Sequence, residues 1–301
     1  MNKLYISIIF SLMCLAVSAQ TIDHEQRYNL LVSKFGPAGV GVETVLNNWA
    51  KVDSTNVKLL AARFDYYFTK AATTQVVAKP GNKYLGMKPV LTLKDSTGAD
   101  VCYYQEQVFD DEIYGKALRA VDKAINTHPY MLEFRFMKAN AYIAYEKESP
   151  DMALAYLIAL AVEDSSRKSP WKYDGKEVDP GFVTDAMKDY CYSFYSIGSQ
   201  KSLDAFMKLS EKMNELHPGN LDYLNNIGTY YLVAANDYKT ALKYYGKVLK
   251  KRPSDYTAIK NSVIAARKMK NTKQEKKYLQ MIVKYGPDNE KTQAELRLKA
   301  L

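Results

Sequence analysis

Apolar residues recur at helical spacing along most of the chain. In residues 40–72 and again in 111–290 they return every three or four positions, which is typical of helices that bury one face. Turn-forming residues interrupt the pattern at short intervals, and prolines mark several of the breaks. The pattern therefore predicts an all-α fold built from many helices of moderate length.

The C-terminal prolines are evenly spaced. Pro218 and Pro253 lie 35 residues apart, and Pro253 and Pro287 lie 34 residues apart. A period of this size is typical of repeat proteins in which each unit is a pair of helices. The unit between Pro253 and Pro287 is degenerate because Glu275 stands where a small residue is expected, which is common in a terminal repeat.

The segment 220–253 carries the clearest repeat. Its first helix has large, large, small and aromatic residues, and its second helix has a small residue followed by larger ones, in the order Leu224, Ile227, Gly228, Tyr231, Ala241, Tyr245 and Val248. This arrangement resembles the tetratricopeptide repeat, a helix-turn-helix unit of 34 residues, in which the small residues, here Gly228 and Ala241, let the two helices approach closely. The resemblance covers 111–290 well and 40–72 weakly, and it implies a right-handed α-solenoid of helical hairpins.

Four regions are expected along the chain. Residues 1–19 resemble a signal peptide, because Lys3 precedes an apolar run that ends in Val17-Ser18-Ala19, so cleavage would leave Gln20 first. Residues 20–72 form N-terminal helices with a degenerate repeat, 73–110 an insertion, and 111–301 the tetratricopeptide-like domain. The protein is expected to be exported, to the periplasm or outside the cell.

Two segments break the helical pattern. In 73–110, alternating apolar residues on both sides of Asp95–Gly98 predict a β-hairpin between the helix near 57–71 and the helix at 112–127. Residues 165–181 are turn-rich and place Trp171 and Tyr173 in a loop. Long insertions in a compact fold are often functional or mobile.

Charge is concentrated in the last third of the chain. The whole sequence has a net charge of +9, yet residues 201–301 alone hold 20 Lys and Arg against 10 Asp and Glu. A solvated basic surface would account for this. It would also suit an acidic protein or peptide partner, or peripheral contact with an anionic membrane surface. No nucleic-acid-binding motif accompanies the charge, so nucleic acid is not an expected partner.

The sequence offers no recognisable catalytic or metal-binding constellation. His128 and His217 both precede a proline at a closing turn, which indicates a structural role. Gly36, Gly39 and Gly41 lack the Lys and Ser/Thr of a phosphate loop, so they are interpreted as a connection between two helices. We therefore expect no enzyme activity, no cofactor and no metal.

Two cysteines follow the predicted cleavage site. Cys102 and Cys191 can form one disulfide bond or remain two free thiols, and the sequence leaves both alternatives open.

The function expected from the resemblance is protein-protein interaction without catalysis. In this family the first helix of each hairpin lines a concave groove, which receives a peptide or a partner helix. Carried onto the two C-terminal repeats, the groove positions are Asp222, Asn225, Asn226, Thr229, Lys260, Asn261, Ile264 and Arg267. The alternative is a carbohydrate-binding or cell-surface accessory protein, in which Trp171 and Tyr173 form an exposed aromatic platform beside the hairpin.

Overall fold

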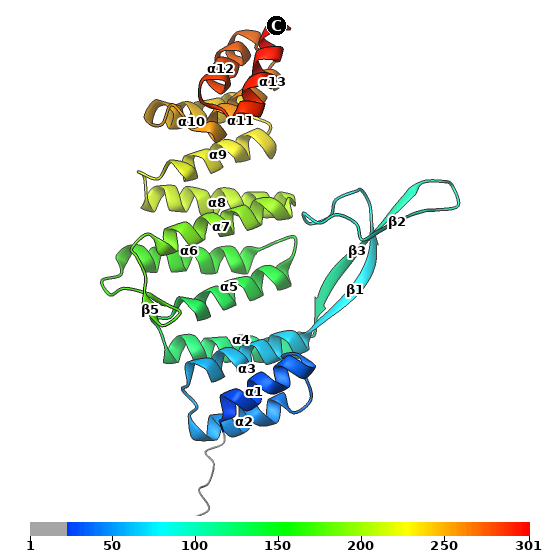
Figure 1. The fold of residues 1–301 in the computed structure, drawn as a ribbon, viewed down its shortest axis with the longest axis vertical. Helices are drawn as coiled ribbons and strands as arrows, with labels where there is room; N and C mark the ends of the chain where they lie inside the picture. Colours follow the sequence, from blue (N-terminus) through cyan, green and yellow to red (C-terminus); the bar gives the residue numbers. More distant parts are fainter. Residues whose placement is uncertain (1–22) are drawn as a thin grey trace, which may run out of the picture.

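Helical hairpins stack in chain order along one long axis (Figure 1). The computed structural model describes residues 23–301, so the predicted signal peptide and its cleavage site lie outside the described residues. The pairs in this described part of the chain are α1 (His24–Phe35) with α2 (Val42–Val52), α3 (Val57–Ala71) with α4 (Asp111–Thr127), and α5 (Leu132–Glu146) with α6 (Asp151–Ser166). They continue as α7 (Phe182–Ile197) with α8 (Gln200–Leu216), α9 (Leu221–Val233) with α10 (Tyr238–Lys251), and α11 (Tyr256–Lys268) with α12 (Thr272–Tyr285). A single helix, α13 (Asp288–Lys299), packs against α12.

Side-chain caps fix where most of these helices begin. An Asp, Asn or Ser immediately before the helix accepts a hydrogen bond from a backbone N–H of the first turn, which would otherwise have no partner. Asp255, for example, accepts from the N–H of Ala258 at 2.9 Å. The capping residues of this kind are Asp23, Asn56, Asp110, Ser199, Asn220, Asp237, Asp255 and Asn271.

The core is divided into consecutive clusters rather than gathered at one centre. Each cluster is shared by neighbouring hairpins, as expected where every unit buries its apolar faces against the next one. The clearest repeat has its close crossing where the sequence predicts it, since Gly228 of α9 faces the fully buried ring of Tyr245 on α10. The protein is mostly helical with small antiparallel sheets, which is consistent with the predicted all-α class, and its stacked hairpins fit the architecture of an α-solenoid.

In the degenerate last repeat, a carboxylate that is paired with two arginines stands where the repeat pattern has a small residue. Glu275 is only 4% exposed, and it accepts hydrogen bonds from Arg267 Nε at 3.0 Å and Arg297 Nε at 2.9 Å. These two guanidinium groups offset the cost of burying the charge. The polar position that weakens the sequence pattern therefore joins α11, α12 and α13.

The insertion forms a three-stranded antiparallel sheet that projects from one side of the stack (Figure 1). Its strands are β1 (Ala72–Lys79), β2 (Leu91–Lys94) and β3 (Asp100–Phe109), in the order β1-β3-β2. The predicted hairpin is present as β2 and β3, joined by the turn at Asp95–Gly98. Strand β1 was not predicted from the sequence. It continues directly from α3 and pairs along β3, with Ala72 opposite Phe109.

The connection between β1 and β2 returns to the helical stack. The hydroxyl of Tyr84 lies within hydrogen-bond distance of two carboxylates, 3.3 Å from Glu106 of β3 and 3.2 Å from Glu148, which follows α5. Gly86 has a positive φ of 79°, and a Cβ there would lie 2.3 Å from the carbonyl oxygen of Ser196 on α7. Only glycine permits this approach, so the insertion is held against α7 at a specific point.

Candidate functional site

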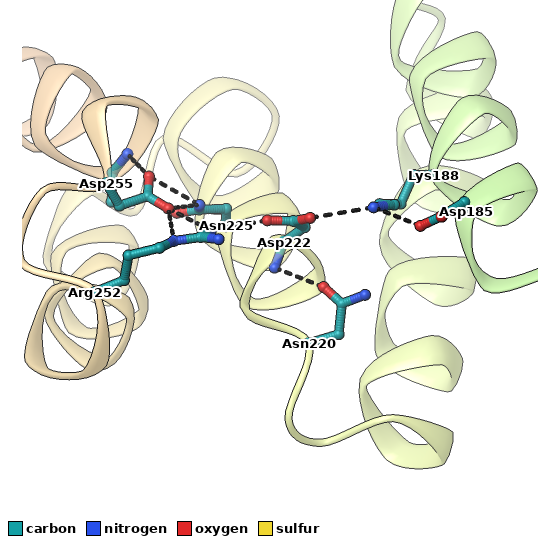
Figure 2. A network of polar contacts seen from close by, with 8 residues as sticks. Asp185, Lys188, Asn220, Asp222, Asn225, Arg252 and Asp255 are labelled. Carbon is teal, nitrogen blue, oxygen red and sulfur yellow. Dashed lines mark hydrogen bonds and ion pairs between the residues drawn. The ribbon is translucent and has the colours of Figure 1, made fainter. Parts of the chain in front are cut away.

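A network of charged and amide side chains connects the N-terminal ends of the first helices α7, α9 and α11 (Figure 2). Asp222 of α9 accepts from Arg252 Nη2 at 2.8 Å and lies 3.4 Å from Lys188 Nζ of α7. Burial alone would raise the pKa of Asp222, but the hydrogen bond from Arg252 and the charge of Lys188 hold this pKa below its ordinary value. Asp222 is thus bound to other residues of the chain.

Asn225 is part of the interior of this network and does not face a groove. It is 6% exposed, and its Nδ2 lies 3.2 Å from both carboxylate oxygens of Asp255, the residue that caps α11. Arg252 Nε donates to the same carboxylate at 2.7 Å. The sequence places Asn225 correctly on α9, but its donors are used to connect two consecutive repeats. The partner contact expected at Asn225 stays a prediction, and in this structure the side chain is buried between the two repeats.

Asn226 is half-buried beside the thiol of Cys191, whose pKa is raised by burial to about 12. None of the described cavities is lined by Asp222, Asn225 or Asn226. The first two turns of α9 thus hold the repeats together.

The remaining groove positions do line cavities. Thr229 and Asn261 lie within hydrogen-bond distance of each other, with 3.3 Å between Asn261 Nδ2 and Thr229 Oγ1. Both line a cavity of about 360 Å³ that also contains Tyr195, Ile264 and Lys268. The side chain of Ile264 is 39% exposed.

Ile264 also lines a second cavity, of about 350 Å³, between α11 and α13. Lys260 and Arg267 stand on its sides together with Arg297. Each cation already has a carboxylate, since Lys260 Nζ lies 2.6 Å from Glu290 and Arg267 contacts Glu275. The hydrogen bond that Lys260 donates to Glu290 raises the pKa of Lys260, so this amine is firmly cationic.

A third cavity, of about 440 Å³, extends the same surface toward the insertion. It shares Tyr195 and Val233 with the first cavity and adds Tyr192 and Lys83. Tyr192 is 69% exposed and Val233 is 41% exposed. The three cavities adjoin through shared residues, and we call this continuous surface the trough. It runs along the first helices α7, α9 and α11 from Lys83 to Arg297.

Most residues that line the trough were not predicted from the sequence, and four of them extend it toward the insertion. These are Tyr192, Tyr195, Val233 and Lys83. Groove positions were predicted only for the two C-terminal repeats. None was predicted for the helix at 182–197. A repeat register extended to that helix would have found the two tyrosines. Lys83 comes from the insertion, and no repeat pattern places it there.

The second inserted segment does not form an exposed aromatic platform. Trp171 is 4% exposed, its Nε1 donates to Asp164 at 2.9 Å, and the guanidinium of Arg167 lies 3.6 Å from its ring centroid. Tyr173 is 41% exposed but packs against Phe182, with 5.3 Å between the ring centroids. The segment folds as two short strands, β4 (Lys172–Tyr173) and β5 (Lys176–Glu177). The carbohydrate-binding alternative requires an exposed Trp171, whereas this side chain is buried in the structure.

The predicted closing-turn histidines make equivalent contacts. Each lies at the end of a second helix and contacts the start of its paired first helix. His128 Nε2 lies 2.6 Å from the carbonyl oxygen of Thr55, and His217 Nε2 lies 3.3 Å from Thr184 Oγ1. Such contacts close a helical hairpin.

Cys102 and Cys191 are both buried free thiols in the structure. Within residues 23–301, no group of His, Cys, Asp and Glu has an arrangement that could hold a metal ion.

Comparison with known proteins assigns no family to this chain, so its class is defined from the structure. No protein-family model matches this chain, and no curated protein matches it. Among the described helices, none has both the length and the apolar character to cross a bilayer. The fold defines the class of the protein as a helical-repeat solenoid with a β-sheet insertion.

Proposed function

We propose that this protein is a non-catalytic, exported scaffold that binds an extended acidic segment of a partner protein in the trough. In this proposal its hairpins are tetratricopeptide-like and wind into a right-handed solenoid. The observation that carries the proposal is the row of three adjoining cavities along α7, α9 and α11. Each has room for a few side chains, and together they suit a chain segment better than one compact ligand.

Apolar contact would supply part of the affinity. Tyr192, Tyr195, Val233 and Ile264 are each more than a third exposed on the same surface. Burying exposed apolar side chains stabilises a complex by roughly 25 cal/mol per Å² before the costs of association are subtracted. Spaced apolar residues in the partner would fill the cavities between these side chains.

The charge of the trough favours an acidic segment. Its lining includes the five cations Lys83, Lys260, Arg267, Lys268 and Arg297, whereas Glu290 is its one carboxylate. Lys260 and Arg267 are bound to Glu290 and Glu275, so a partner carboxylate would compete with these residues for the same donors. Complementary charge of this kind speeds association and selects between partners.

The chemistry of the lining supports binding rather than catalysis. Amide, hydroxyl, aliphatic and cationic side chains make up most of the trough, and its lining contains neither histidine nor cysteine. A lining of this composition suits hydrogen bonding, apolar contact and charge pairing with a bound segment.

A set of defined peptides tests the proposal. Fluorescein-labelled peptides of equal length would combine acidic or basic residues with apolar or polar ones, and anisotropy would report their binding. We expect the acidic-apolar peptides to bind most tightly, and affinity to fall when either property is removed. Equal binding of basic and acidic peptides would contradict the proposal.

A pair of matched substitutions locates the binding surface. Ile264→Ser removes an apolar side chain from the trough, whereas Val162→Ser removes one with similar exposure from α6, outside it. Ile264→Ser is expected to weaken peptide binding at least tenfold, which corresponds to about 1.4 kcal/mol. Val162→Ser should leave binding unchanged. Equal effects of the two substitutions would place the peptide elsewhere.

A further inference from the structure

The second helices of the last two complete hairpins carry rows of lysines on their solvent side. On α10 these are Lys239, Lys243, Lys247 and Lys250, and on α12 they are Lys273, Lys276, Lys277 and Lys284. All eight are exposed. In each helix the lysines lie on the side opposite to the buried residues, because helical positions three, four, seven and eleven apart share a face. We call these two rows the lysine ridges.

The ridges are separate from the trough. None of the eight lysines lines a described cavity, and the trough is formed mainly by the first helices α7, α9 and α11. Part of the large positive charge of the C-terminal third is thus located on the second helices. The trough proposal does not account for it.

Nothing else in the described chain neutralises the ridges. None of the eight lysines forms an ion pair within residues 23–301. Helix α10 contains no acidic residue, and the one acidic residue of α12 is the buried Glu275. Like charges four residues apart on a helix repel each other, as for Lys239 with Lys243. The ridges therefore lower helix stability and are not compensated internally.

The other second helices of the solenoid differ. Helices α4 and α8 each carry three cations and three acidic residues, and α6 carries three acidic residues and no cation. A surface that served only solubility would mix the two signs, as α4 and α8 do. The single-sign surface begins at α10 and is specific to the end of the stack.

We propose that the lysine ridges dock the protein on the surface of a bilayer that contains anionic phospholipids. Gly246 and Gln280 lie between the lysines, so no bulky side chain projects from either ridge. A lysine is a flexible point charge that adapts to mobile headgroups, whereas recognition of one fixed phosphate usually relies on arginine or a recessed site. The ridges contain neither. The trough, on other helices, would remain open to its partner.

Vesicle flotation of the mature protein tests this inference. The probes are vesicles of phosphatidylcholine alone and vesicles of an equal mixture of phosphatidylcholine and phosphatidylglycerol. We expect binding to the mixed vesicles only, and its release at about 0.5 M NaCl, because salt screens contacts between exposed charges. No binding at low salt would overturn the proposal. Tighter binding to duplex nucleic acid than to the mixed vesicles at the same salt would also overturn it.

Matched variants separate a specific ridge from net charge. One variant replaces Lys239, Lys243, Lys247 and Lys250 by Gln. The control removes the same charge from exposed lysines elsewhere that form no ion pair, namely Lys51, Lys88, Lys123 and Lys201. Each lysine at an anionic surface raises partitioning roughly fivefold, so the ridge variant should lose at least tenfold and the control much less. Equal losses in both variants would refute a ridge-specific contact.

Folding and trough function are monitored in the same variants. The ridge variant should melt at the same temperature as the parent protein or higher, because its substitutions relieve repulsion between like charges. It should still bind the peptides selected by the trough. A failure of peptide binding in the parent protein would refute the proposed function and leave the vesicle result unaffected.

Discussion

The contact between Gly228 and Tyr245 gives the sharpest test of the repeat packing. A Cβ at position 228 would lie 2.7 Å from Cε1 and 3.0 Å from Cδ1 of Tyr245, too close for van der Waals contact. The ring of Tyr245 is fully buried, and its hydroxyl lies 3.2 Å from Thr229 Oγ1, so the ring has little freedom to move. Gly228→Ala should therefore overpack the crossing of α9 and α10.

Gly246 provides a control that isolates this overpacking. It lies in the middle of α10, is exposed, and has no atom within 4 Å of the position that a Cβ would occupy. Replacing a glycine by alanine inside a helix stabilises it by about 1 kcal/mol, and this gain applies to both sites. Gly246→Ala should show the full gain. Gly228→Ala should be less stable than Gly246→Ala by about 1–3 kcal/mol, the usual cost of overpacking a core.

Urea denaturation followed by far-ultraviolet circular dichroism measures both free energies of unfolding. A third variant, with Tyr245→Leu as background, tests the cause. If the ring is the obstacle, Gly228→Ala should cost less in that background, with a coupling energy on the order of 0.5–3 kcal/mol. Equal stabilisation by Gly228→Ala and Gly246→Ala in the parent protein would show that the two helices do not cross at Gly228.

Three further predictions concern other parts of the chain. The hydrogen bond from Arg297, together with that from Arg267, outweighs burial and lowers the pKa of Glu275. The ionised Glu275 therefore stabilises the folded protein above about pH 4.5, and this contribution is lost as the pH falls through the lowered pKa. Glu275→Gln should thus reduce the free energy of unfolding by about 1–3 kcal/mol at neutral pH and flatten its acid dependence, whereas the exposed Glu211→Gln should do neither. In a Trp49→Phe background, the fluorescence of Trp171 should be weakly quenched by acrylamide, because this indole is buried, and strong quenching would contradict its placement. Under the proposed export, N-terminal sequencing of the protein should find Gln20 first, and a retained Met1 would exclude cleavage.

Much of the helical architecture could be predicted from local patterns. The helix expected near 57–71 is α3, the helix expected at 112–127 is α4, and the hairpin around Asp95–Gly98 is present as β2 and β3. These features depend on residues close in sequence: apolar spacing, capping side chains and a short turn. Strand β1 was missed because its partner, β3, follows about 30 residues later, and its own sequence has weak alternation.

The sequence by itself determined the helical repeat, the close approach at Gly228 and the concentration of positive charge in the last third, because all three depend on residue type and spacing. Only the tertiary structure decided which polar side chains remain available. Asn225 and Thr229 lie one helical turn apart on α9, yet Asn225 is buried against Asp255 and Thr229 lines the trough. The same holds for Trp171, which is buried in the core cluster that α5, α6, α7 and α8 share. Burial depends on what the neighbouring repeats bring to each side chain, and periodicity within one helix does not contain that information.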